Sequence, residues 1–391
     1  MQAPAFWRRF WPRAAETKAS ATGALLLELQ GRPVWTPRDY AALAREGFMK
    51  NAVTYRCVRF IAETAASVPW LAYEGETELD RHPLLDLLVQ PNPAQGGATL
   101  LECWYGFLQA AGNAYMEAVT VEGEPRELYV LRPDRMKVVP GACGWPEAYE
   151  YSAGGRSVVF ARDAETGFSP VLHLSLFHPL NDYYGLSPLE AAAASIDVHN
   201  AASAWNKALL DNAARPSGAL VYKGPDGAGG LTGAQFENLK SQLEEAYTGS
   251  ANAGRPLLLE GGLDWKPMSL SPADMDFINA KHVAAREIAL AFGVPPQLLG
   301  IPGDATYANY REANQAFWRH TIVPLVTKSA QAMTNWLGGL YGAPVRLAPD
   351  WDQVEALSLE REALWARVNA ASFLTEDEKR AAVGYGAKDA R

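Results

Sequence analysis

Cysteine and catalytic motifs are scarce in this sequence of 391 residues. Its three cysteines, Cys57, Cys103 and Cys143, lie far apart and form no Cys-x-x-Cys pair, which argues against a disulfide framework and against a zinc site. No His-Glu-x-x-His, Gly-x-Ser-x-Gly or Walker motif occurs. We therefore expect no metal, no cofactor and no catalytic centre.

Long apolar runs and an excess of positive charge are also missing. No apolar run reaches about 18 residues, so we expect no transmembrane helix and a protein made in the cytoplasm. The 35 Lys and Arg residues are outnumbered by 44 Asp and Glu, which gives a formal net charge of −9. This negative net charge argues against a protein that binds nucleic acid tightly by neutralising its phosphates, although it permits a surface past which DNA slides.

The clearest element that is present is a long helix over residues 187–214. It opens with Ser187-Pro188-Leu189-Glu190 and ends before Arg215-Pro216. One face consists of small or weakly apolar residues at 3.5-residue spacing: Ala191, Ala194, Val198, Ala201, Trp205, Ala208 and Asn212. Such a face permits close approach to other helices. The helix is either an Ala-rich helix inside one domain or a stave in a ring of identical subunits.

The segments before and after this helix predict an α+β protein. A helix begins at Asn51, and strand-like runs separated by Gly, Pro and Asp turns occupy residues 113–176. After the long helix, a small β-α-β-β module is inserted before a second helix, 273–292. Its elements are a strand at 219–222, a helix from 232, and a hairpin of 256–260 with 263–266.

The C-terminal part of the sequence is predicted to be helical. A segment rich in Pro and Gly leads into a helix over residues 309–336, which should kink at Pro324 because proline lacks the backbone N–H. Two further helices are predicted at 354–371 and 376–383, and Thr375 is the expected N-cap of the second.

Several short motifs follow one another along residues 50–386. In order, they are 51–69, His82-Pro83-Leu84, Pro91-Asn92-Pro93, Gly112-Asn113-Ala114-Tyr115, Leu131-Arg132-Pro133, His173, Tyr184-Gly185-Leu186-Ser187-Pro188-Leu189, Gly293-Val294-Pro295-Pro296-Gln297-Leu298-Leu299-Gly300 and Leu374-Thr375-Glu376-Asp377-Glu378. This ordered set resembles the portal proteins of tailed bacteriophages. The short chain without a long crown is similar to the portals of long-tailed phages and of phage-derived gene transfer agents, and both possibilities stay open.

The resemblance implies a ring, typically of twelve subunits, with a mixed α/β wing, a two-helix stem, a small α/β clip, a kinked helix and a short helical crown. Carried onto this chain, the parts are the wing at 1–186 with a loosely ordered lead-in at 1–50, stem helix 1 at 187–215, the clip at 216–271, stem helix 2 at 272–292, the tunnel loop at 293–309, the kinked wing helix and strand at 310–350, and the crown at 351–391.

The resemblance also assigns roles to residues. Subunit contacts on the stem would involve Ala194, Ala201, Trp205, Ala208, Ala284 and Ile288. The tunnel loop would bring into the DNA channel Pro302, Gly303, Asp304, Thr306 and Tyr307. A basic ring near the channel, unless these residues form only a solvated face, would comprise Arg311, Arg319 and Lys328. Docking of partners on the clip would involve Tyr222, Phe236, Tyr247 and Trp265.

The implied function is structural and not enzymatic. The ring would sit at one capsid vertex of the virion, after assembly in the bacterial host cytoplasm, and would conduct double-stranded DNA during packaging and ejection. Its partners would be further copies of the chain, the DNA, the large terminase, the head-tail adaptor, the major capsid protein and the scaffold, with no membrane.

Two alternatives are open on the sequence. Another ring-forming neck adaptor would share the oligomer features but should lack a clip between two stem helices. A DNA-end-processing enzyme would need clustered carboxylates for metal, and the cluster Glu376-Asp377-Glu378 is better explained as negative charge at a helix start.

Overall fold

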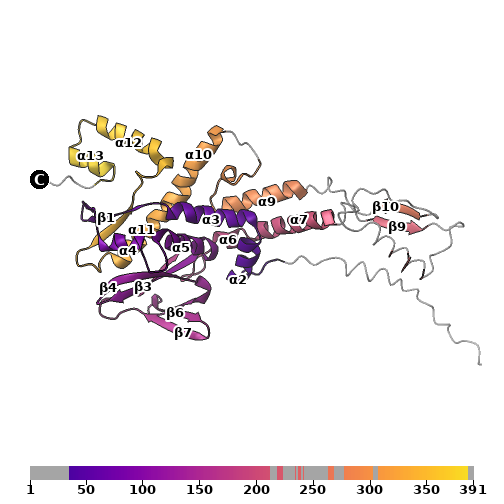
Figure 1. The fold of residues 1–391 in the computed structure, drawn as a ribbon, viewed down its shortest axis with the longest axis horizontal. Helices are drawn as coiled ribbons and strands as arrows, with labels where there is room; N and C mark the ends of the chain where they lie inside the picture. Colours follow the sequence, from indigo (N-terminus) through magenta and orange to yellow (C-terminus); the bar gives the residue numbers. More distant parts are fainter. Residues whose placement is uncertain are drawn as a thin grey trace, which may run out of the picture. The chain divides into compact units, whose positions relative to one another are not determined.

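The computed structural model describes residues 35–211, 218–222, 263–267, 277–302 and 307–385, together with four single helical positions between 234 and 241. Contacts divide the chain into Met1–Trp35 and Thr36–Arg391, and all helices and strands described below belong to the second unit. Helices and antiparallel sheets alternate along it (Figure 1), so the α+β class is confirmed.

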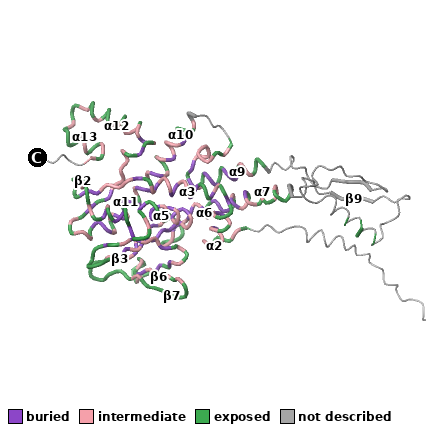
Figure 2. The backbone as a smooth tube through the Cα atoms, viewed as in Figure 1, coloured by how far each residue is buried: buried purple, intermediate pink, exposed green. Residues whose placement is uncertain are grey.

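Two helices form the centre of the hydrophobic core. They are α3 (Ala52–Ala66) and α5 (Gly97–Ala111). Asn51 starts α3 as predicted, because its Oδ1 accepts the N–H groups of Val53 and Thr54, each at 3.1 Å. Each helix buries one stripe at three- to four-residue spacing, and the two stripes pack together in the region where Figure 2 shows most of the buried chain: Cys57, Ile61, Ala65, Leu100, Trp104 and Leu108.

Three sheets of three antiparallel strands accompany these helices, in the orders β11-β1-β2, β4-β3-β8 and β5-β6-β7. Their bounds are Trp70–Glu74 (β1), Thr77–Leu79 (β2), Asn113–Val121 (β3), Glu124–Leu131 (β4), Met136–Pro140 (β5), Pro146–Ala153 (β6), Arg156–Ala161 (β7), Val171–Ser175 (β8) and Val345–Pro349 (β11). The strand-like runs predicted over 113–176 are therefore β3 to β8. In the first sheet, Trp70 lies opposite Pro349, which joins the C-terminal part of the chain to the N-terminal part.

Two glycines let the backbone cross itself where the second sheet meets the next helix. Gly112 has a φ of 70°, and a Cβ on Gly185 would lie 2.2 Å from the Gly112 carbonyl oxygen. The side-chain amide of Asn113 holds this crossing in place. Its Oδ1 accepts from Gly185 N at 2.8 Å and from His173 Nε2 at 3.0 Å, and its Nδ2 donates to Ala111 O at 2.9 Å. The motifs around residues 112 and 185 are thus one three-dimensional junction.

The long helix predicted from Ser187 is divided after its first turn. α6 (Pro188–Ala191) and α7 (Ala193–Asp211) are separated by a turn at Ala192. Ser187 is the N-cap, since its Oγ accepts the Glu190 N–H at 2.9 Å. The predicted end of this helix, 212–214, lies outside the described residues. The described part of the second long helix is α9 (Phe277–Ala291), which packs against α7.

Between these two helices, the structure describes one pair of strands. β9 (Gly218–Tyr222) and β10 (Leu263–Pro267) are antiparallel, with Leu263 opposite Tyr222. We expected β10 to form a hairpin with residues 256–260, which lie outside the described residues. The described partner of β10 is β9.

The helix predicted over 309–336 changes its geometry just before Pro324. α10 (Tyr307–Phe317) and α11 (Val323–Leu337) are joined by a π-helical segment, η5 (Trp318–Ile322). Pro324 donates no N–H and its ring displaces the carbonyl four residues earlier, so regular α-helical bonding is lost through this turn. The kink predicted at Pro324 stays a prediction, and the helix starts two residues earlier than expected.

The remaining helices are short or peripheral. They are α2 (Tyr40–Leu43), the π-helical η1 (Ala44–Met49), α4 (Pro83–Val89), the 3-10 turns η2 (Pro133–Arg135), η4 (Pro296–Leu299) and η6 (Glu355–Leu357), α12 (Ser358–Ala370) and α13 (Glu376–Ala382). Thr375 caps α13 through a complete capping box with Glu378, as predicted, and Gly384 follows it with a φ of 93°.

The glycine crossing predicts a large effect of one methyl group. Gly185→Ala should destabilise the fold by about 3–5 kcal/mol, because the new Cβ would meet backbone atoms that cannot move independently. Gly106→Ala is the matched control, since a Cβ at this position of α5 meets no atom within 4 Å, and it should stabilise the helix by about 1 kcal/mol. Urea unfolding of both variants tests this; equal stabilities would contradict the crossing.

Half-buried His173 predicts a specific acid sensitivity. Burial lowers the pKa of its imidazole to about 4, and the ring stacks on Tyr115 at 4.3 Å. A lowered folded-state pKa means that the unfolded chain takes up the proton first, so this stability is complete above about pH 6.5 and falls as the pH drops toward 4. Between pH 7 and 4.5 the parent protein should lose about 2–3 kcal/mol more than His173→Gln, which keeps a donor for Asn113. Equal acid losses would contradict the burial of a neutral imidazole.

Candidate functional site

The stripe of small residues predicted for subunit contact lies on the outer face of α7. Ala194, Ala201 and Ala208 are exposed, and Trp205 is half-buried. The opposite face is buried in the chain's own core, through Leu189, Ala193, Ile196 and Ala202. The helix therefore uses one face to hold the subunit together and leaves the predicted face uncovered, as the exposed stretches of α7 in Figure 2 show.

The corresponding prediction for the second stem helix is wrong. Ala284 is 2% exposed and Ile288 is fully buried, because both side chains pack inside the chain's own core. They cannot meet a neighbouring subunit. The outer face of α9 instead carries Val283, Arg286 and Leu290, of which Leu290 is 79% exposed. The i, i+7 pair of Val283 and Leu290 is the sequence signal that would have pointed to this face.

A buried polar network holds α7 against the N-terminal helices. Asn51 Nδ2 lies 3.0 Å from His199 Nδ1 and donates to Asn200 Oδ1, also at 3.0 Å. Asn200 Nδ2 in turn donates to Glu46 O at 2.8 Å. Burial, reinforced by repulsion from Lys281, lowers the pKa of His199, so the imidazole is neutral at neutral pH and its Nδ1 accepts from Asn51. The same asparagine that starts α3 thereby sets the position of the stem.

Further contacts tie the stem to the chain that precedes α2 and to its partner helix. The backbone N–H of Thr36 donates to Asp197 at 2.9 Å, and Arg38 Nη1 donates to Glu190 O at 2.6 Å. Ser195 Oγ of α7 donates to Glu287 of α9 at 2.7 Å. These polar bonds complement the apolar packing of α7 and α9.

The segment after α9, predicted as a loop over 293–309, is more ordered than its Pro and Gly content indicates. Residues Pro296–Leu299 form the 3-10 turn η4, and Gly300 follows with a φ of 70°, so this part of the predicted loop is helical. Pro302 is exposed. Gly303, Asp304 and Thr306 lie outside the described residues, and Tyr307 is the first residue of α10.

The three basic residues predicted to form a ring have different surroundings. Arg311 is exposed on α10. Arg319 Nη2 lies 2.5 Å from Glu360 Oε1 in an ion pair that joins η5 to α12. Lys328 Nζ donates to Ser175 O at 2.6 Å, and partial burial lowers the pKa of its ammonium group. The structure does not bring these side chains together. Arg319 and Lys328 each bond to another part of the chain, whereas Arg311 is exposed to solvent.

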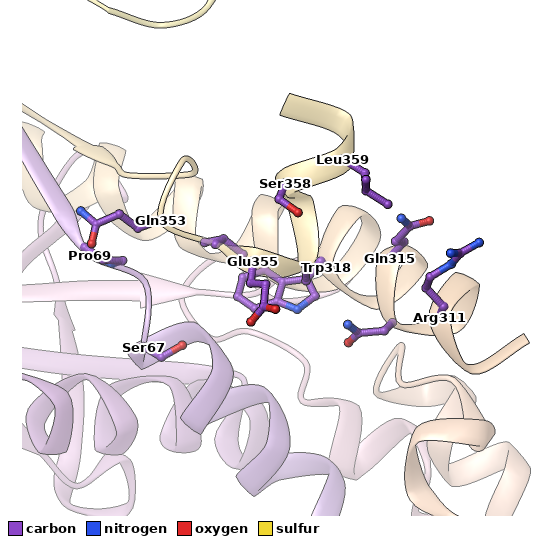
Figure 3. A pocket seen from close by; sticks show the side chains of 12 residues that line it. Ser67, Pro69, Arg311, Gln315, Trp318, Gln353, Glu355, Ser358 and Leu359 are labelled. Atoms are coloured by element: carbon purple, nitrogen blue, oxygen red, sulfur yellow. The ribbon is translucent and has the colours of Figure 1, made fainter. Parts of the chain in front are cut away.

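Arg311 stands at the edge of a groove of about 660 Å³ with a mixed polar and apolar lining. The groove lies between the end of α3, the α10 and η5 helices, and the chain that leads into α12. Figure 3 shows Arg311 and Gln315 at one end of it, Trp318 and Glu355 near its centre, and Gln353 at the other end. Its amides, one guanidinium, one indole, two serine hydroxyls and the Glu355 carboxylate can bind polar groups of a partner.

The residues predicted for the clip are only partly placed. Tyr222 ends β9 and Trp265 lies in β10, so the pairing of these strands brings both positions into one two-stranded sheet. Phe236 and Tyr247 lie outside the described residues.

The described part of the chain contains no group of three or more His, Cys, Asp or Glu side chains arranged to hold a metal ion. Among its helices, none combines the length and apolarity that a membrane span requires.

Comparison with known proteins identifies the family. The family model described as "Phage portal protein" matches residues 52–384. The chain belongs to the phage portal protein family. The portal function expected from the ordered motifs is thereby confirmed, and the matched residues include the glycine crossing, α7, α9 and α10 to α13.

Individual relatives agree with this assignment. A chain in the solved neck of an empty gene transfer agent (GTA) particle, computed with C6 symmetry, is 55% identical with a TM-score of 0.71, covering 94% of this chain and 100% of that one. A chain in the neck of a native GTA particle, computed with C12 symmetry, is 54% identical with a TM-score of 0.69, covering 93% and 98%. The portal protein of Enterobacteria phage HK97 is 24% identical over 75% of this chain and 68% of that protein.

Proposed function

We propose that twelve copies of this chain form the portal ring in the neck of a GTA-type particle and conduct double-stranded DNA into and out of its head. The observation that carries the proposal is the 55% identity to a chain of a GTA particle neck over 94% of the sequence. The twelvefold number rests on the C12 symmetry of the related native neck. In this role the chain is a component of the particle and leaves ATP hydrolysis to a separate packaging motor.

The outer face of α7 is the proposed contact between neighbouring subunits. A closed ring needs a head-to-tail interface, in which one surface of a subunit meets a different surface of the next. Ala194 and Ala201 leave room for a larger side chain, and the uncovered Val283 and Leu290 of α9 are suitable partners from the next copy. The burial of the opposite face in the subunit core keeps both helices in place before the ring forms.

Ala201 and Ala202 provide a matched pair for testing this contact. Ala201→Leu should leave the stability of the single chain within about 0.5 kcal/mol but prevent ring formation, because it fills the space reserved for the neighbour. Ala202 is 4% exposed in the chain's own core, so Ala202→Leu should cost the single chain about 1–3 kcal/mol. Mass photometry and thermal unfolding separate the two effects. Unchanged rings with Ala201→Leu would contradict the proposed contact.

The segment 293–309 is proposed to line the channel where DNA passes. Its few charges suit a sliding surface, since a dense positive ring would hold phosphates and slow the strand. Arg311, at the start of the following helix, supplies an isolated positive charge, whereas Arg319 is already neutralised by Glu360. Contact with DNA would thus be mainly steric, with weak electrostatic guidance.

The clip, residues 216–271, is proposed to bind the large terminase during packaging and the head-tail adaptor afterwards, while the wing meets the major capsid protein and scaffold. In support, β9 and β10 pair with each other, so that the described strands between α7 and α9 form one sheet that carries Tyr222 and Trp265.

Replacing Gly224–Lys266 with a short linker tests the clip assignment. The variant should keep the fold of the wing and the ring, because the core lies in other elements, but it should lose binding to both terminase and adaptor. Surface plasmon resonance on assembled rings measures this, with Ala201→Leu as the control for effects of losing the ring. Terminase binding by the deleted variant would show that the motor docks elsewhere.

A further inference from the structure

Arg286 of α9 makes a hydrogen bond to the segment that follows this helix. It is exposed on the outer face of the helix, and its Nη2 donates to the carbonyl oxygen of Pro302 at 2.5 Å, sixteen residues later in the chain. A guanidinium is permanently charged and bonds a carbonyl oxygen more strongly than a neutral donor does. The contact therefore joins the stem to the far end of the segment that follows it.

The near end of that segment is fixed in a different way. Val294 is 2% exposed and its N–H donates to Ala289 O at 2.9 Å, so it continues the core of the stem. Thr321 Oγ1 of η5 donates to Gly293 O at 2.6 Å. Ile301 N donates to Pro296 O at 3.3 Å, which folds the segment on itself. Among the described residues, Arg286 makes the side-chain bond that fixes the far end.

We propose that Arg286 is a positioning residue that holds the end of segment 293–302 on stem helix α9, so that this part of the channel wall follows the stem. The proposal rests on the proposed function for the channel role of the segment. The adjacent Glu287 accepts the hydroxyl of Ser195 on α7 at 2.7 Å. Glu287 thus contacts α7, and its neighbour Arg286 contacts the segment after α9. A displacement of the stem is therefore passed on to Pro302.

Hydrogen exchange on assembled rings tests the contact directly. Arg286→Met keeps the length of the side chain but removes its donors, and it should accelerate exchange of the Leu298, Gly300 and Ile301 amides about tenfold. Arg286→Lys keeps the charge and a donor and should restore most of the protection. Arg81→Gln, at an exposed arginine before α4, controls for loss of charge. Exchange at Val294 and along α9 should not change in any variant.

A second readout separates this inference from the channel assignment. DNA retained in filled particles should fall with Arg286→Met and recover with Arg286→Lys. Unchanged exchange at residues 298–301 with Arg286→Met, whatever happens to the DNA, would overturn the role of Arg286. Accelerated exchange with full DNA retention would support the positioning role and would show that the segment does not bear on DNA, which contradicts the proposed function of the segment alone.

Discussion

The close crossing of Gly112 and Gly185 is the constraint on which the arrangement of this chain depends. A Cβ on either glycine would lie 2.4 Å or less from the other's carbonyl oxygen, and Asn113 uses both ends of its amide to hold the crossing. Ser187 begins the stem two residues beyond it. The direction in which α6 and α7 leave the sheet is therefore determined by backbone atoms, which are stiffer than any side-chain contact.

A second constraint gives α7 and α9 two different faces. Asn51, His199 and Asn200 fix the inner face of α7, and the buried Ala284 and Ile288 fix that of α9. The outer faces carry small residues on one helix and larger apolar residues on the other. The inner faces therefore belong to the chain's own core, whereas the outer faces are uncovered in the single chain.

The sequence predicted helix starts and strands well because both depend on local chemistry. Asn51, Ser187 and Thr375 cap helices through their own side chains, and glycine or proline turns delimit the strands of residues 113–176. Periodicity showed that α9 has an apolar seam but could not show which partner covers it, so Ala284 and Ile288 were assigned to the wrong side. The pairing of Arg319 with Glu360 joins two segments far apart in the chain, which no local pattern reports.

A cryo-EM reconstruction of particles filled with DNA and built from this chain tests the central claim most directly. We predict a twelve-subunit ring in which Ala194 and Ala201 of each subunit contact the next copy and segment 293–302 is the part of the wall nearest the DNA. A ring whose α7 outer faces are exposed to solvent, or whose narrowest point is lined by residues 216–271, would contradict it.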